Sequence, residues 1–318
     1  MTGETHRARA REEEHGPLVP LALDTVRRLL ALDAGHGARA ALPGVREALR
    51  RFPELSADPA GPPGHDSDEL AALAELCEVI GWILFDAGRY RAAHHANLRA
   101  LALAERCGDR ATARLVLLNH SMLQTQLDRP RAALASVARV AGPRALPALV
   151  DSLVLVRRAH AAALLGGGAR AARLIRRARS RFLDGASPAD PPWAWWIDRT
   201  ELLGHHGWVL ARLGEFGAAV PLLHEAATAP GPSYRHLFTA ELLAALAGAG
   251  AWREAEDLIA DLAPRAAAIG SARTTETLGR AAAHLLGRAD APPNARAAAA
   301  FLRESLPARP APDRRARS

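Results

Sequence analysis

The stretch LCEVIGWILFDAGRYRAAHHANLRALALAERCGD, residues 76–109, decides the fold. Its apolar residues recur at helical spacing on both sides of Gly88, so we expect one helix to end there and a second to run from about Tyr90 to Cys107. Gly81 stands seven residues before Gly88, and Ala93 five residues after it. Small residues at these places let two antiparallel helices approach closely, and the turn glycine supplies the backbone freedom that a short loop needs. The stretch therefore predicts a helical hairpin.

The same pattern recurs four more times along the chain. Each copy has a turn residue and a small residue five positions later, and the turn residues are Asp128, Gly166, Gly214 and Gly250. The five turns lie 40, 38, 48 and 36 residues apart, and the longest step contains an inserted loop at about 184–192. A period slightly above 34 residues is typical of tetratricopeptide-like arrays. We therefore predict an all-α fold, a tetratricopeptide-like α-solenoid of antiparallel helical hairpins around an open trough. An unrelated alanine-rich helical bundle is the alternative.

The composition agrees with an all-helical protein. Hydrophobic residues make up 49% of the chain and aromatic residues only 4%, so alanine and leucine, both strong helix formers, supply most of the core. All 41 basic residues are arginine, yet the net charge is only +7, and we do not expect this chain alone to bind nucleic acid directly. The charged N-terminus lacks the apolar core of a signal peptide, and no apolar run is long enough to span a bilayer. We predict a cytoplasmic protein with no membrane contact.

The domain organisation follows from the same patterns. Residues 1–17 and 305–318 are rich in charge, the second also in proline, and we expect both to be disordered tails. Residues 18–304 form the helical repeat domain, in which 18–52 add an N-terminal hairpin and 271–304 a last helix pair that caps the array. Tyr90 is expected to fill the wedge between successive hairpins.

A search for catalytic and metal-binding motifs finds none of the established ones. The adjacent pairs His94-His95 and His205-His206 cannot chelate a metal well from one helix, because neighbouring side chains point about 100° apart. We therefore predict a protein that is not an enzyme and uses neither cofactor nor metal. The alternative is an enzyme that uses His205 with Asp198 and Glu201, which precedes His205 by four residues.

The segment PPWAWWIDR, residues 191–199, places three of the six tryptophans within four positions and is expected to open the first helix of the Gly214 hairpin. Successive residues rotate around a helix, so at least one ring should face the groove or solvent. The rings either fill the gap left by the inserted loop or form an aromatic wall for a peptide or small ligand.

Counting back from each turn residue identifies the first-helix positions that should line the concave groove. Together with two tryptophans of the aromatic segment, the predicted partner-binding residues are Glu75, Glu78, Trp82, Asp86, His160, Trp195, Trp196, Glu201, Trp208 and Arg212. Acidic residues at one end and aromatic residues further along suit a peptide with a basic or apolar stretch.

Three stretches resemble a known family. They are VRRLLALDAGHGARAALPGVREAL (26–49), LAELCEVIGWILFDAGRYRAAHHANLRALALAERCGD (73–109) and PPWAWWIDRTELLGHHGWVLARLG (191–214). They resemble the tetratricopeptide-like C-terminal region of actinobacterial helix-turn-helix transcriptional regulators of the λ-repressor type, over roughly residues 24–288. The resemblance implies a sensing or dimerising region that a DNA-binding domain usually precedes. A helix-turn-helix needs about three helices, and only about 20 residues come before the resemblance, so we expect this chain to lack that domain.

The resulting functional hypothesis is a tetratricopeptide-like regulatory protein that binds a peptide or protein partner in its concave groove and is linked to transcriptional regulation. A homodimer is left open. The first alternative is the sensor part of a DNA-binding regulator whose helix-turn-helix is missing or on another chain. The second is a small-molecule-binding enzyme that uses the Trp, His and Asp cluster.

Overall fold

The computed structural model describes residues 18–56, 64–142 and 145–307, and in this part of the chain every regular element is a helix. The prediction of an all-α fold is confirmed. The α-helices are α2 (Leu18–His36), α3 (Ala38–Arg51), α4 (Ser67–Asp86), α5 (Tyr90–Cys107), α6 (Arg110–Gln126), α7 (Pro130–Ala138), α8 (Ala148–Leu164), α9 (Gly168–Leu183), α10 (Arg199–Arg212), α11 (Phe216–Thr228), α12 (His236–Ala249), α13 (Trp252–Leu262), α14 (Ala272–Gly287) and α15 (Pro293–Ser305). Four short 3-10 helices connect them: η1 (Pro53–Ser56), η2 (Pro192–Trp196), η3 (Ser233–Arg235) and η4 (Ala263–Ala268).

The predicted tails fall largely outside the described residues. Segment 1–17 lies outside them entirely, and so does 308–318. Ser305 is the last residue of α15, one position beyond the expected end of the helical domain.

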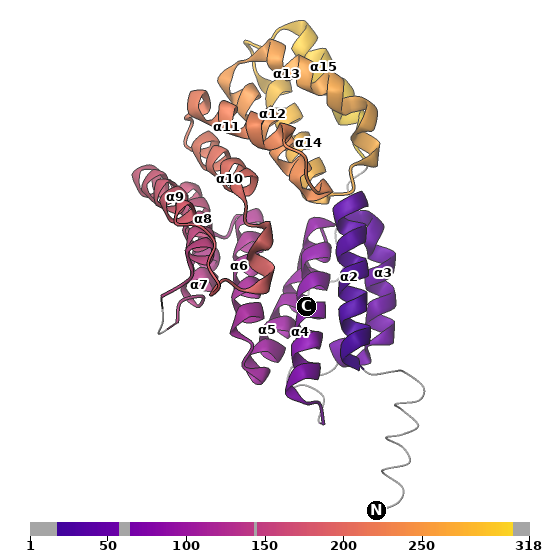
Figure 1. Ribbon diagram of the computed structural model, residues 1–318. Coiled ribbons are helices and arrows are strands. Elements are labelled where there is room, and N and C mark those ends of the chain that lie inside the picture. Colours follow the sequence, from indigo (N-terminus) through magenta and orange to yellow (C-terminus); the bar gives the residue numbers. More distant parts are fainter. Residues whose placement is uncertain (1–17, 57–63, 143–144, 308–318) are drawn as a thin grey trace, which may run out of the picture.

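From α2 to α13 each helix packs against the next, which gives a succession of helical hairpins, while α14 packs on α12 and α15 on both α13 and α14 (Figure 1). The five predicted turn residues all have the left-handed backbone that such turns need. Their φ angles are 75° at Gly88, 55° at Asp128, 74° at Gly166, 80° at Gly214 and 72° at Gly250. Among the described residues, Asp128 is the only one other than glycine with a positive φ.

The small residues five positions after these turns lie where the two helices of each hairpin cross. Ala93, Ala133, Ala171, Ala219 and Ala255 are all fully buried. At Gly207, a Cβ atom would lie 2.6 Å from Cγ of Leu223, so the α10 backbone comes within contact distance of α11 only because no side chain intervenes. The spacing of small residues therefore sets how closely the helices of a hairpin approach.

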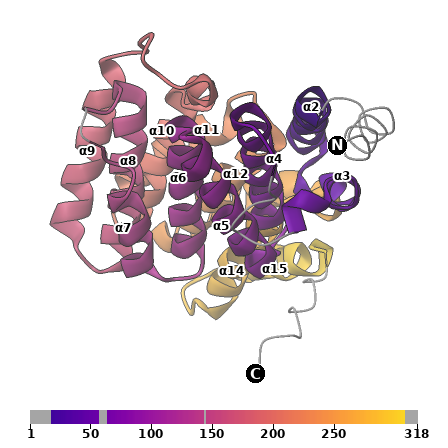
Figure 2. The same cartoon turned by 90° about the horizontal axis from the view of Figure 1, so that it is seen from below.

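The two ends of the helical succession meet. Ser271, just before α14, donates a hydrogen bond of 2.8 Å to Oδ1 of Asp86 at the end of α4. Tyr90 at the start of α5 donates one of 2.7 Å to Glu276 of α14. Figures 1 and 2 both show the C-terminal helices returning to the N-terminal ones. The helices therefore follow an arch whose two ends are in contact. The expected open trough is closed where α14 meets the end of α4 and the start of α5.

Glycines allow the closest part of this contact. The backbone N–H of Arg39 donates to the carbonyl of Gly270 over 2.9 Å. A Cβ atom on Gly270 would lie 2.3 Å from the carbonyl oxygen of His36, so only glycine fits there.

Tyr90 lies in a hydrophobic cluster with Phe85 of α4 and Leu123 of α6, between two successive hairpins as expected, and it also donates to Glu276 of the distant α14. One local expectation differs from the structure. The three tryptophans do not open α10. They lie on η2, because Pro191 and Pro192 set an extended entry and Asp198 caps α10, which begins only at Arg199.

Candidate functional site

A cavity of about 480 Å³ lies inside the arch. Its walls come from the even-numbered helices α2 to α14 and from η2 and η3. Aromatic rings form much of the lining: Trp82, Trp193, Trp195, Trp196, Tyr234 and Phe238. This volume is within the range of about 300–1,000 Å³ that is usual for small-ligand sites.

One wall of the cavity is acidic. Asp33 of α2 and Glu78 of α4 are both buried there, and Glu75 lies one helical turn before Glu78. The indole N–H of Trp82 donates to Oδ2 of Asp33 over 2.9 Å, whereas Oδ1 of Asp33 has no partner among the described atoms. Glu78 accepts a hydrogen bond of 2.7 Å from the side-chain amide of Asn119. Neither carboxylate has a described cationic side chain within ion-pair distance.

The pKa values of these two carboxyl groups follow from that geometry. Burial and, to a smaller extent, the nearby Asp86 raise the pKa of Asp33 to about 6, against the smaller opposing effects of the Trp82 hydrogen bond and the Arg273 charge. Burial raises the pKa of Glu78 to about 7, although the Asn119 hydrogen bond acts in the opposite direction. A cationic ligand group placed between them would stabilise both charged forms.

A buried guanidinium lies on another wall. Arg157 of α8 is fully buried, and burial lowers its pKa to about 10. Its Nε donates to the carbonyl of Leu118 over 3.3 Å, Nη1 lies 3.3 Å from Nε2 of His205, and Nη2 has no partner among the described atoms. An arginine can only donate, so Nε2 of His205 is the acceptor and its proton is on Nδ1.

The histidines beside Arg157 are neutral. Burial and the Arg157 charge hold the pKa values of His160 and His205 well below the ordinary range. His160 stacks on Trp208 with ring centroids 4.1 Å apart, and the Arg212 guanidinium also lies over the Trp208 ring, 5.0 Å from its centroid. These side chains form a layer behind the cavity wall.

The inserted segment supplies the aromatic part of the lining. Trp193 is held by a hydrogen bond of 2.9 Å from its indole N–H to the carbonyl of Ala111 on α6. Trp195 is 77% exposed, although it also lines the cavity, so it lies at the rim. Arg235 of η3 donates to Asp198 over 2.6 Å and to Glu201 over 3.0 Å, which fixes the start of α10 next to the cavity.

The structure brings six of the ten predicted partner-binding residues to this cavity: Glu75, Glu78, Trp82, Trp195, Trp196 and Glu201. The other four lie beside it. Asp86 is buried at the contact between α4 and α14, and His160, Trp208 and Arg212 form the layer behind the wall.

Sequence reasoning missed several lining residues. Asp33 and Tyr234 lie on segments far apart in the sequence that meet only because the arch closes. At this meeting point the Ser233 hydroxyl donates to the carbonyl of Asp33 over 2.6 Å. Arg157 lies on α8, where counting back from Gly166 did not select it, and Arg273 lies on α14, beyond the last of the five turns. An arginine directly after the apolar run 153–156 is the sequence signal that could have identified Arg157.

The chemical options of the site are narrow. Among the described residues, no three His, Cys, Asp or Glu side chains converge in a way that could hold a metal ion. Nε2 of His205 lies 3.6 Å from Glu201 but accepts its hydrogen bond from Arg157, so its lone pair is already in use. The geometry suits the binding of a ligand that carries apolar and cationic groups.

Within the described part of the chain, none of the helices combines the length and apolar character that crossing a bilayer would need. A comparison with protein-family models finds no match for this chain, and neither does a comparison with curated proteins.

Proposed function

We propose that this chain is a tetratricopeptide-like regulatory protein that binds a short peptide, or one end of a longer one, in the cavity of its arch. The observation that carries the proposal is a cavity of about 480 Å³ with aromatic rings on several sides and two buried carboxyl groups on one wall, neither with a described cationic side chain within ion-pair distance. The role is binding without catalysis, in the cytoplasm.

The lining determines the chemistry of the ligand. Asp33 and Glu78 favour an ammonium or guanidinium group at the wall that also holds Trp82. The apolar remainder of the ligand would pack against Trp196, Phe238 and Leu237. A cavity closed by contacts between α4 and α14 favours a few residues of peptide over a folded partner.

The link to transcriptional regulation rests on the resemblance of three stretches to the C-terminal regions of helix-turn-helix regulators. Under this second candidate function, the chain is the sensing part, and DNA is contacted through another chain or domain. Ligand binding in the cavity is the same in both cases.

The test incubates the full chain with a synthetic tetrapeptide library and identifies the co-eluting peptides by mass spectrometry. We expect enrichment of peptides with Lys or Arg, and loss of this enrichment in the double variant Asp33→Asn/Glu78→Gln. A variant of the exposed α13 residue Glu254→Gln is the matched control and should retain the enrichment. Retention of no peptide, or equal retention by the double variant, would contradict the proposal.

A further inference from the structure

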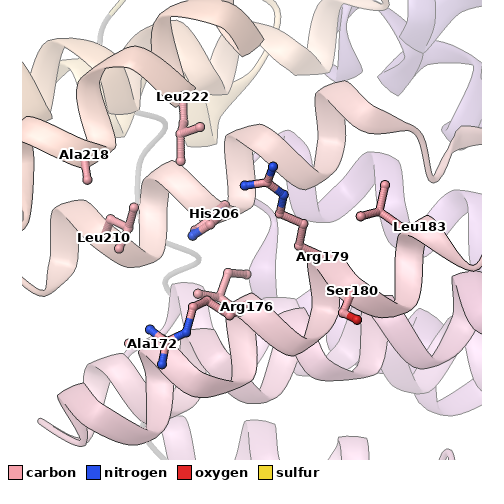
Figure 3. A pocket seen from close by; sticks show the side chains of 10 residues that line it. Ala172, Arg176, Arg179, Ser180, Leu183, His206, Leu210, Ala218 and Leu222 are labelled. Atoms are coloured by element: carbon pink, nitrogen blue, oxygen red, sulfur yellow. The ribbon is translucent and has the colours of Figure 1, made fainter.

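A second hollow lies on the outer face of the arch, away from the interior cavity. It is a groove of about 640 Å³ between α9, α10 and α11 (Figure 3). One helical stripe of α9 forms its longest wall, from Ala172 to Leu183, while His206 and Leu210 of α10 and Ala218 and Leu222 of α11 complete it.

The floor of this groove is apolar and open to solvent. Ile175 at its base is fully buried, Leu210 and Leu222 are partly buried, and Leu183 at its end is 75% exposed. An isolated exposed leucine needs no explanation, but an exposed leucine at the end of a concave groove lined by further apolar side chains is typical of a protein interaction site.

Arginines form the edge of the groove. Six arginines lie on α9, and Arg181 alone is paired, with Asp151 over 2.9 Å and also with Asp184. The other five are exposed and have no carboxylate within ion-pair distance in the described part of the chain: Arg170, Arg173, Arg176, Arg177 and Arg179. Arg176 and Arg179 line the groove itself, and Figure 3 shows Arg179 extending from α9 toward the side of α10 and α11.

The environment of His206 is consistent with this positive edge. Its ring lines the groove between the same two arginines, and burial together with their charges lowers its pKa. Near neutral pH the histidine is therefore an uncharged part of the floor, and the positive charge is concentrated in the guanidinium groups.

We propose that this groove docks an acidic amphipathic helix of a protein partner. Apolar side chains at positions i, i+3, i+4 and i+7 of the partner helix would enter the groove, and its Asp or Glu residues would pair with Arg176 and Arg179. Nucleic acid fits less well, because its phosphates gain nothing from a leucine-lined floor and the groove has no Trp, Tyr or Phe ring for base stacking. The site is separate from the interior cavity, so it does not depend on the function proposed above.

The test uses fluorescence anisotropy of the full chain with a fluorescein-labelled synthetic 18-residue peptide that has Leu at the four helical positions and Glu elsewhere. We expect it to bind at least about tenfold more tightly than the same peptide with Lys in place of Glu. The double variant R176E/R179E should weaken binding by at least about tenfold, because like charges then face each other.

The matched control is R170E/R173E, which makes the same change on the same helix outside the groove. It should retain the affinity within about twofold. Leu183→Ser removes an exposed apolar contact without disturbing the core, and it should also weaken binding. Far-UV circular dichroism of each variant checks that the helices are intact.

Three outcomes would overturn the proposal. The first is an equal loss of binding in R176E/R179E and R170E/R173E, or no loss in either. The second is tighter binding of a labelled DNA duplex than of the acidic peptide, together with a loss of DNA binding in R176E/R179E but not in R170E/R173E. The third is a homodimer in light scattering that R176E/R179E dissociates, which would make a second copy of this chain the occupant.

Discussion

Glu78 is a buried acid without a cation, and this arrangement has a cost in stability. Its pKa is raised from the ordinary 4.5 to about 7, mainly by burial, so ionising it is less favourable in the folded than in the unfolded protein. The protonated form of Glu78 is favoured by folding, so its contribution to the free energy of unfolding is present in full below pH 4.5 and is lost as the pH rises through 7. Proteins often tolerate such groups where a ligand or a reaction needs them.

The replacement Glu78→Gln removes the ionisation and retains an acceptor for Asn119. Relative to the unchanged protein, we expect a gain in the free energy of unfolding that grows from pH 5 to pH 8 and reaches up to about 3 kcal/mol. Urea unfolding at a series of pH values measures it. Glu254→Gln on exposed α13 should show no such trend, and a gain for Glu78→Gln that is independent of pH would refute the assignment.

The turn residues allow a test in which two substitutions should change the free energy of unfolding in opposite directions. Gly166 has φ 74° and no atom within 4 Å of a Cβ position, so Gly166→Ala changes only the backbone energy and should cost about 1 kcal/mol. Asp128 has φ 55° at the equivalent turn, and Asp128→Gly should gain about 0.5 kcal/mol. Chemical denaturation measures both, and a loss for Asp128→Gly would show that its side chain stabilises the turn.

At the scale of helices, one glycine controls the approach of α10 to α12. A Cβ atom on Gly204 would lie 2.2 Å from the ring of Phe238, which lines the interior cavity. Gly204→Ala should therefore cost about 1–3 kcal/mol and displace this ring, which would also weaken ligand binding.

The control for this substitution is Gly217→Ala on α11, where a Cβ atom meets nothing within 4 Å. It should be neutral or gain up to about 1 kcal/mol, because alanine favours the helix. Thermal unfolding compares the two variants. Equal effects would mean that the contact between Gly204 and Phe238 does not limit packing.

The hairpins were predictable because their signals are local. The turn glycines and the alanines five positions later are separated by a few residues, and each acts through its own turn or its own helix pair. The position of the tryptophans was not predictable in this way, because Pro191 and Pro192 delay the start of α10 until Asp198 can cap it. Helical periodicity alone did not reveal that boundary.

At the scale of the whole molecule, contacts between distant segments decide which residues share the cavity. Asp33 and Tyr234 lie about 200 residues apart and meet only where η3 packs on α2. No local pattern reports such a contact, so the sequence indicated the α4 side of the site and missed the α2 side. For the same reason, the expected open trough is closed by α14.

A buried ion pair lies at the closure. Nε of Arg273 lies 3.4 Å from Oδ1 of Asp86, and both side chains are buried, although the geometry is not that of an aligned hydrogen bond. The Arg273 guanidinium also lies over the ring of Phe85, 4.6 Å from its centroid. Together these contacts join α14 to the end of α4.

Arg273→Met should preserve the packing on Phe85 but leave the Asp86 carboxylate buried without a cation, at a cost of about 3–5 kcal/mol. The double variant Asp86→Asn/Arg273→Met removes that charge and should recover most of the loss. Urea unfolding measures both. If the double variant is as unstable as Arg273→Met, the ion pair does not account for the closure.

The most direct test of ligand binding inside the arch is fluorine NMR of the full chain labelled with 5-fluorotryptophan. Trp82 lines the interior cavity, whereas Trp252 on α13 lines neither the cavity nor the outer groove and lies beneath Arg288. On titration with synthetic tetrapeptides that carry Lys or Arg, we predict a saturable shift of the Trp82 resonance and an unchanged Trp252 resonance. A Trp82 resonance that stays unchanged with every such peptide, or one that moves only together with Trp252, would contradict the account.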